Sequence, residues 1–231
     1  MTGLHSLDRV VGDKWPPLGS DDDLRAFESV PYEQRIAARS TYEALQCGAA
    51  RGPQTPAILF LPNASPDDEP VRLTHGEFLA KVTQVANAVR SLGVGPRDVV
   101  SLMLPLVPQA FYALYGAQAA GIANPINSFL EAEQIAHILR GAGTKVLITL
   151  GPTPGFDIWE KVSPIRSELP DLKAILAVGG SALQTNGALD FDTLVESQPA
   201  DGCVSARRFD PLSAPKIDPG RMASPGMKTM G

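Results

Sequence analysis

Four short apolar runs recur along the chain at nearly constant spacing, and this rhythm is the strongest constraint on the fold. The runs begin at Val99, Ile122, Val146 and Ala174, so that successive starts lie 23, 24 and 28 residues apart. Such spacing accommodates a strand, a returning helix and two short loops, as in a βαβ unit. The runs are nearly continuously apolar and do not alternate, which is typical of strands covered on both faces. We therefore predict an α/β fold with a mostly parallel, doubly wound sheet and right-handed crossovers.

The segment from Leu73 to Gly93 carries the clearest local signals of a helix. Thr74 and Glu77 have the spacing of a capping box, in which the hydroxyl and the carboxylate each satisfy a backbone N–H. Apolar residues then recur at helical spacing, at Phe78, Leu79, Val82, Val85, Ala86, Val89 and Leu92. Gly93 can supply the left-handed residue that ends the helix. The sequence thus predicts a long helix with one apolar face.

Weaker patterns place the remaining elements. Helices are expected near residues 22–27, over 40–47 with Gly48 as its stop, over 109–120, from 131 to a stop at Gly141 and Gly143, over 157–168 and over 191–196. Strands are expected over 57–61, 98–104, 122–126, 146–150 and 174–178, and a loop over 63–69.

Composition divides the chain into three regions. Residues 1–39 are polar and acidic, and we expect an irregular N-terminal arm there. Residues 40–209 hold the periodic elements and form the expected domain. Residues 210–231 contain no aromatic residue, four prolines and three glycines, so a disordered C-terminal tail is expected.

Charge and cysteine content limit the possible partners. The formal net charge of −5 gives no basic footprint for nucleic acid. No run reaches the roughly 18 apolar residues that a membrane span needs, and no signal-peptide pattern is present, so a cytoplasmic location is expected. Cys47 and Cys203 lie far apart, and His5, His75 and His137 lack the spacing of metal ligands.

Three segments together resemble a known family. LTHGEFL at residues 73–79 is similar to the segment L-T-Y-x-E-L that opens a long helix in the adenylate-forming, AMP-forming acyl-CoA synthetases. AQAAGIANPIN at residues 117–127 resembles their A-x-x-A-G-x-x-x-x-P-I-N segment. Between them, GVGPRDVV at residues 93–100 resembles their glycine turn into a strand. The order and spacing agree, and the resemblance covers roughly residues 40–180.

The resemblance implies part of the N-terminal domain of a two-step ligase. In that family a carboxylate attacks the α-phosphate of ATP to give an acyl-adenylate, and coenzyme A then displaces AMP. The family uses ATP, Mg²⁺ and coenzyme A, and holds the phosphates with a loop similar to T-S/G-G-T-T-G-x-P-K. Backbone N–H groups and cations carry such a phosphate cradle.

The chain departs from the family where that loop should follow. After Phe209 it reads DPLSAPKIDPG, without Thr-Thr-Gly. We therefore expect no catalytic, cofactor-binding or metal-binding residues in this chain, no bound cofactor, and no activity by the chain alone. A frameshift or premature stop near Leu212 is one hypothesis. A split ligase completed by a complementary C-terminal fragment is a second, and an unrelated small-molecule-binding α/β module is a third.

Overall fold

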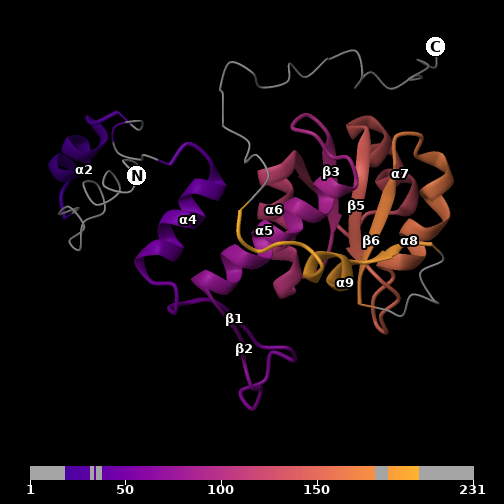
Figure 1. Ribbon diagram of the computed structural model, residues 1–231, viewed down its shortest axis with the longest axis horizontal. Coiled ribbons are helices and arrows are strands. Elements are labelled where there is room, and N and C mark those ends of the chain that lie inside the picture. The colour runs from indigo at the N-terminus through magenta and orange to yellow at the C-terminus, as the bar shows by residue number, and fades with distance from the viewer. Residues whose placement is uncertain (1–18, 32–33, 35–37, 180–186, 203–231) are drawn as a thin grey trace, which may run out of the picture. The chain divides into compact units, whose positions relative to one another are not determined.

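The computed structural model describes residues 19–31, 34, 38–179 and 187–202 (Figure 1). By its internal contacts the chain forms two compact units, Met1–Leu79 and Ala80–Gly231. Helix α5, His75–Ser91, runs through the boundary between them. Most of the expected arm and all of the expected tail at 210–231 lie outside the described residues, so the domain limits at 39 and 209 stay predictions.

The described part of the first unit includes helices α2 and α4 and a strand pair before α5 begins. Helix α2 spans Asp21–Glu28 and helix α4 spans Thr41–Arg51, and each starts at a serine whose hydroxyl oxygen accepts a backbone N–H. Strand β1, Pro56–Phe60, pairs antiparallel with β2, Val71–Thr74, which the sequence did not predict. The prediction that α4 stops at Gly48 was wrong. An interior glycine costs a helix only about 1 kcal/mol, and here the helix continues to Arg51.

Helix α5 begins and ends as predicted. The Thr74 backbone N–H donates to Glu77 Oε2 at 2.8 Å, and the Glu77 N–H donates to Thr74 Oγ1 at 3.2 Å, which is the expected capping box. After the last turn Gly93 adopts φ +84°. The apolar face is fully buried at Val82, Val85, Ala86 and Val89.

The second unit is built on a parallel five-stranded sheet among the described residues. Its strands are β3 Val99–Met103, β4 Ile122–Pro125, β5 Thr144–Leu150, β6 Ala174–Val178 and β7 Leu189–Asp190. Their order is β4-β3-β5-β6-β7, and all neighbours are parallel. The predicted parallel sheet is confirmed, and the two-residue strand β7 is an addition to it.

Helices cover both faces of this sheet (Figure 1). They are α6 Pro108–Ala120, α7 Ala132–Ala142, α8 Ile158–Ile165 with a 3-10 turn at Arg166–Glu168, and α9 Phe191–Glu196. On one face α6 lies against α5, since a Cβ on Gly116 would be 2.5 Å from Val85 Cβ. On the same face Tyr112 of α6 stacks on Phe191 of α9, with ring centroids 6.0 Å apart. Helices α7 and α8 cover the other face, as a doubly wound sheet requires.

The core beneath α7 and α8 is made of aliphatic side chains and one tryptophan. It includes Met103, Ile135, Leu139, Leu147, Trp159, Val162 and Ile175. Helix α7 continues through Gly141, against the prediction, and ends at Gly143, which adopts φ +62°. Gly141 needs no left-handed backbone, so only Gly143 acts as the stop. No helix in the described ranges has the length and apolar character to cross a membrane.

Candidate functional site

The strand order places a topological switch point between β3 and β5. From β3 the chain runs to β4, which lies on one side of β3. From β4 it then passes β3 to reach β5, which lies on the other side. Successive crossovers therefore leave the sheet on opposite faces, and a crevice opens where the two loops diverge. In open α/β sheets ligands bind in such a crevice, beyond the carboxyl ends of the strands. The fold thus places the candidate site at the carboxyl edge of β3, β4 and β5.

Two glycines bring the main chain of neighbouring loops together at this edge. The Gly151 N–H, directly after β5, donates to the Val178 carbonyl at 2.8 Å. A side chain on Gly151 would collide with the carbonyl oxygen of Gly179, which itself has φ +68°. Glycine is therefore required at position 151, where the loops after β5 and β6 pack main chain against main chain.

Lys161 joins the loops that follow β4 and β5. Its Nζ lies 2.9 Å from Asp157 Oδ2 and donates to the Ser128 carbonyl at 3.2 Å. Ser128 and Asp157, the two residues that Lys161 contacts, are each adjacent in sequence to an exposed aromatic residue. Phe129 is 88% exposed and Phe156 is 47% exposed. Leu106 in the loop after β3 is 75% exposed. Each of the loops after β3, β4 and β5 thus carries one large exposed apolar side chain.

The asparagines beside Pro125 shape this region. Asn127 Oδ1 accepts the Phe129 backbone N–H at 3.0 Å, which orders the loop after β4. Asn124 Nδ2 donates to Ser101 Oγ at 3.0 Å, and Ser101 Oγ lies 2.7 Å from Thr144 Oγ1. Ser101 is fully buried, so this polar ladder joins β4, β3 and β5 and offers no nucleophile.

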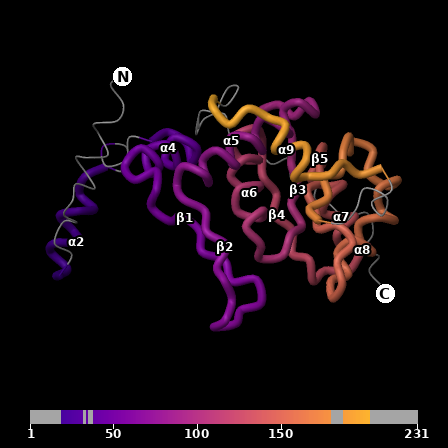
Figure 2. Tube along the Cα trace, turned by 60° about the horizontal axis from the view of Figure 1, so that its bottom comes forward, coloured from indigo at the N-terminus to yellow at the C-terminus, as the bar shows by residue number. Residues whose placement is uncertain are grey.

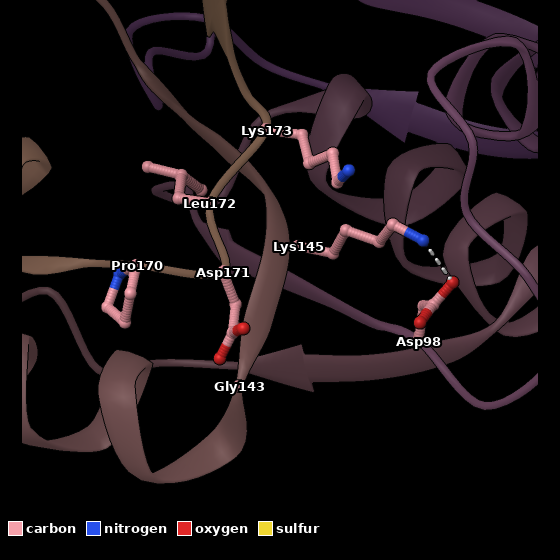
Figure 3. A pocket seen from close by; sticks show the side chains of 7 residues that line it. All are labelled: Asp98, Gly143, Lys145, Pro170, Asp171, Leu172 and Lys173. Atoms are coloured by element: carbon pink, nitrogen blue, oxygen red, sulfur yellow. Dashed lines mark hydrogen bonds and ion pairs between the residues drawn. The ribbon is translucent and has the colours of Figure 1, made fainter.

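A separate cleft of about 600 Å³ opens at the opposite, amino edge of the sheet (Figure 3). Lys145 Nζ donates to Asp98 Oδ2 at 2.6 Å there, and the Gly95 N–H donates to the same oxygen at 2.7 Å. The hydrogen bond from Lys145 lowers the pKa of the Asp98 carboxyl, against the opposing effect of burial. Lys173 extends beside Lys145, whereas Asp171 points away from them (Figure 3). Because ligands of doubly wound sheets bind at the carboxyl edge, we assign the Asp98–Lys145 pair a structural role.

The remaining sequence predictions concern metal ligands and the helix stop before β5. Within the described ranges, no three His, Cys, Asp or Glu side chains come together as a metal site. No role in holding magnesium is therefore assigned to these residues. His137 lies exposed on α7, and residues 141–145 form the end of that helix and the start of β5, as expected for a helix stop. The prediction that this chain supplies no catalytic or cofactor-binding residue stays a prediction.

The fold and the carboxyl-edge loops define the class, a doubly wound α/β domain of the kind that carries a ligand at its switch point. A family model described as AMP-binding enzyme matches residues 45–223. The chain therefore belongs to the AMP-binding enzyme family, which confirms the resemblance. The match extends beyond residue 209, the predicted end of the domain.

Relatives by sequence are CoA ligases. The chain is 29% identical over 177 residues to marinolic acid–CoA ligase of Pseudoalteromonas sp., covering 77% of this chain and 27% of the relative. It is 36% identical over 100 residues to acetyl-coenzyme A synthetase of Xylella fastidiosa, covering 43% of this chain and 15% of the relative. The chain thus spans less than a third of the length of these relatives.

Solved structures agree with this assignment. Acetoacetyl-CoA synthetase from Streptomyces lividans superposes with a TM-score of 0.61 at 28% identity, over 72% of this chain and 26% of that one. The N-terminal domain of FACL13 from Mycobacterium tuberculosis superposes with a TM-score of 0.57 at 23% identity, over 71% of this chain and 38% of that one. The second likeness supports the fold alone. The chain corresponds to an N-terminal portion of the ligase fold.

Proposed function

We propose that this chain supplies the N-terminal portion of an AMP-forming acyl-CoA synthetase. The observation that carries the proposal is the family match over residues 45–223 on a doubly wound parallel sheet. In such a ligase a carboxylate attacks the α-phosphate of ATP, pyrophosphate leaves, and the coenzyme A thiol then displaces AMP from the acyl-adenylate. The cytoplasmic location expected from the sequence is kept as part of this proposal.

The role proposed for these residues is to shape the site and not to carry out the chemistry. Gly151 lets the loops after β5 and β6 pack main chain against main chain, and Lys161 fixes the loops that carry Phe129 and Phe156. A preformed cradle of backbone N–H groups and cations is needed to hold and activate a triphosphate. Because the 231 residues contain no Thr-Thr-Gly phosphate loop, we propose that acyl-adenylate formation needs polypeptide in addition to them.

The identity of the acid is left open by the relatives, since they are named for marinolic, acetic and, in Drosophila melanogaster, long-chain fatty acids. The proposal therefore covers carboxylic acids as a class. A split ligase, in which a second chain supplies the remaining parts of the enzyme, is consistent with this proposal. An unrelated small-molecule-binding module finds no support in the comparisons.

Complementation tests the proposal. The purified chain is assayed for ATP–pyrophosphate exchange and for thioester formation with acetate and with a long-chain fatty acid, alone and after co-expression with the complementary portion of marinolic acid–CoA ligase. The matched control replaces this chain with the corresponding N-terminal portion of that ligase itself. We expect no product from the chain alone and product from the complemented pair. Acyl-AMP made by the chain alone refutes the need for more polypeptide, and activity in the control pair only refutes the proposed role.

A further inference from the structure

One long stretch of the sheet domain contains no charged side chain. From Val99 to Leu130 the sequence holds no Asp, Glu, Lys, Arg or His. The stretch forms β3, α6 and β4, and α6 lies beside both strands (Figure 2). It also includes the exposed side chains of Leu106, Phe111 and Phe129. Charged residues make up about a quarter of an average soluble protein, so an uncharged stretch that reaches the surface calls for an explanation.

One side of α6 is closely packed. Its Gly116 approaches Val85 of α5, where a Cβ would lie 2.5 Å from Val85 Cβ, and its Tyr112 stacks on Phe191 of α9. Both Tyr112 and Gly116 are buried. Packing against the neighbouring helices and the sheet therefore explains the apolar residues on this side of α6.

The other side of α6 is uncharged although it is open to solvent. Phe111, Leu114 and Gln118 are three and four residues apart, so they lie along one side of the helix. Phe111 and Gln118 are exposed and Leu114 is half-buried. Every other described helix carries at least one charged residue, whereas α6 carries none. A helix without a polar, charged face is typical of one that is covered on all sides.

The helices on the opposite face of the sheet show the usual surface pattern. Helix α7 exposes Glu133, His137 and Arg140, and α8 exposes Glu160. That face therefore has the composition of a surface in contact with water. The outer side of α6 instead has the composition of an interface core, where charged residues are depleted.

We infer that the outer side of α6, around Phe111, Leu114 and Gln118, is a docking surface for the part of the ligase that this chain does not contain. The chain corresponds to 27% of marinolic acid–CoA ligase and 26% of acetoacetyl-CoA synthetase, so a complete ligase has enough further polypeptide to cover this surface. The facing surface is expected to be apolar, because a charge buried against α6 would find no opposite charge there. This inference rests on the proposed function.

Cysteine labelling of the 231-residue chain tests the location of the surface. In Phe111→Cys we expect the thiol to react with a maleimide about ten-fold more slowly once the complementary portion of marinolic acid–CoA ligase is bound, because labelling requires exposure. The matched control, His137→Cys on α7, should keep its rate. Peptide mass spectrometry reports each position separately from Cys47 and Cys203.

Two results of this labelling overturn the inference. One is an unchanged rate at position 111 in the complex. The other is slower labelling at position 111 when the concentration of the chain alone is raised, which assigns the surface to a second copy of the chain.

The affinity of the two portions provides the second test. In Phe111→Lys we expect the Kd for the complementary portion to rise about ten-fold or more, as for a residue at the centre of an interface. His137→Lys should leave the Kd within about two-fold of wild type, as expected for a residue outside an interface. Urea unfolding of each chain alone should give a midpoint close to wild type, because both residues are exposed.

The outcomes separate this inference from the proposed function. An unchanged Kd in Phe111→Lys overturns the inference, and if that variant has a lowered urea midpoint the labelling of Phe111→Cys decides. If the wild-type chain does not bind the complementary portion while the N-terminal portion of marinolic acid–CoA ligase does, the proposed function fails and the inference fails with it.

Discussion

Gly121 packs directly against the backbone of Asp98. A Cβ at position 121 would lie 2.5 Å from the Asp98 carbonyl oxygen and 3.0 Å from that of Gly95. The same Asp98 carbonyl accepts the Ile122 N–H at 2.9 Å, next to the start of the β3–β4 pairing. Two segments that carry the family resemblance, residues 93–100 and 117–127, thus meet through their main chains, and this contact explains the glycine that ends α6.

Replacing Gly121 with alanine adds only one methyl group but should destabilise the fold strongly. The added methyl group must push the Asp98 backbone away, and overpacking of this kind costs about 1–3 kcal/mol. Urea unfolding of Gly121→Ala should show that loss. Gly141→Ala is the matched control, because a Cβ there meets nothing within 4 Å. It lies inside α7, so alanine should stabilise the chain by about 0.5–1 kcal/mol. Equal effects of the two variants would show that the close approach is not what requires glycine.

The sheet domain was largely predictable because its signals are local. Continuous apolar runs gave β3 to β6, and the spacing of Thr74 and Glu77 gave the start of α5. Strands β2 and β7 were not predicted, because strands of four and two residues show too little periodicity in the sequence. Each is defined by its pairing with a neighbouring strand. Gly48 and Gly141 lie within helices and do not end them, and sequence alone does not distinguish a glycine at a helix end from one inside a helix.

The side-chain contacts between residues far apart in the sequence were not predictable. Lys145 and Asp98 lie 47 residues apart in the chain, and no local pattern marks them as a pair. Gln84 and Asn87 donate to main-chain carbonyls more than 100 residues away. Every residue has such a carbonyl, so the sequence does not reveal which residues accept these bonds. What the sequence did provide was topology. The parallel order of the strands identifies the carboxyl edge, and the site is then expected there because ligands of open α/β sheets bind beyond the carboxyl ends of the strands.

Loss of the small Ser101 hydroxyl should lower the free energy of unfolding substantially. Ser101→Ala removes the partner of both Asn124 and Thr144 inside the sheet. Leaving buried polar groups without a partner costs about 1–3 kcal/mol, which chemical denaturation should detect. Thr149→Val serves as the control, since Thr149 is equally buried but its hydroxyl makes one long bond of 3.5 Å. A loss in Thr149→Val as large as in Ser101→Ala would contradict the importance of the ladder.

Thr74→Ala should weaken the start of α5. The substitution removes the oxygen that accepts the Glu77 N–H, and loss of an N-cap side chain typically costs about 1 kcal/mol. Thr74→Ser keeps that oxygen and should remain close to wild type. Urea titration of the two variants provides the measurement. If serine and alanine proved equally destabilising, the methyl group of Thr74 rather than its hydroxyl would be the important part.

Asp98→Asn should lower stability in a pH-dependent way. The pKa of Asp98 is lowered in the folded chain, chiefly by the hydrogen bond from Lys145, so the carboxylate contributes stability above its unfolded pKa. That contribution is lost as pH falls through the lower, folded pKa. Because the pair is partly exposed, water screens it, and we expect a loss of about 0.5–1 kcal/mol at pH 7.

The deficit of Asp98→Asn should therefore shrink when the free energy of unfolding is measured at pH 3 and below. Glu168→Gln is a suitable control, because it breaks the more exposed Arg140–Glu168 pair, whose atoms lie 2.8 Å apart. Its effect should stay within about 0.5 kcal/mol at either pH. A deficit for Asp98→Asn that is constant with pH would rule out a charge effect.

Asp192→Asn should raise the stability of the fold, whereas Asp98→Asn should lower it. Burial, and then the neighbouring Asp190, raise the pKa of the Asp192 carboxyl in the folded chain, with Glu196 adding to the effect. Lys81 and a hydrogen bond from Gln109 oppose it only in part, and the facing Tyr112 is itself a buried phenol whose pKa is raised. The ionised carboxylate is therefore disfavoured in the fold, and its penalty applies above the folded pKa.

That penalty disappears as pH falls through the raised folded pKa toward the unfolded value. Asn keeps an acceptor for Gln109 but carries no charge, so Asp192→Asn should be more stable than wild type at pH 8 and similar to it near pH 4. Unfolding by urea at the two pH values measures the difference, and Asp171→Asn, in an exposed loop, provides the comparison. If Asp192→Asn were destabilising at pH 8, the carboxylate would have to be a favourable partner of Lys81, and burial would not be the dominant influence on its ionisation.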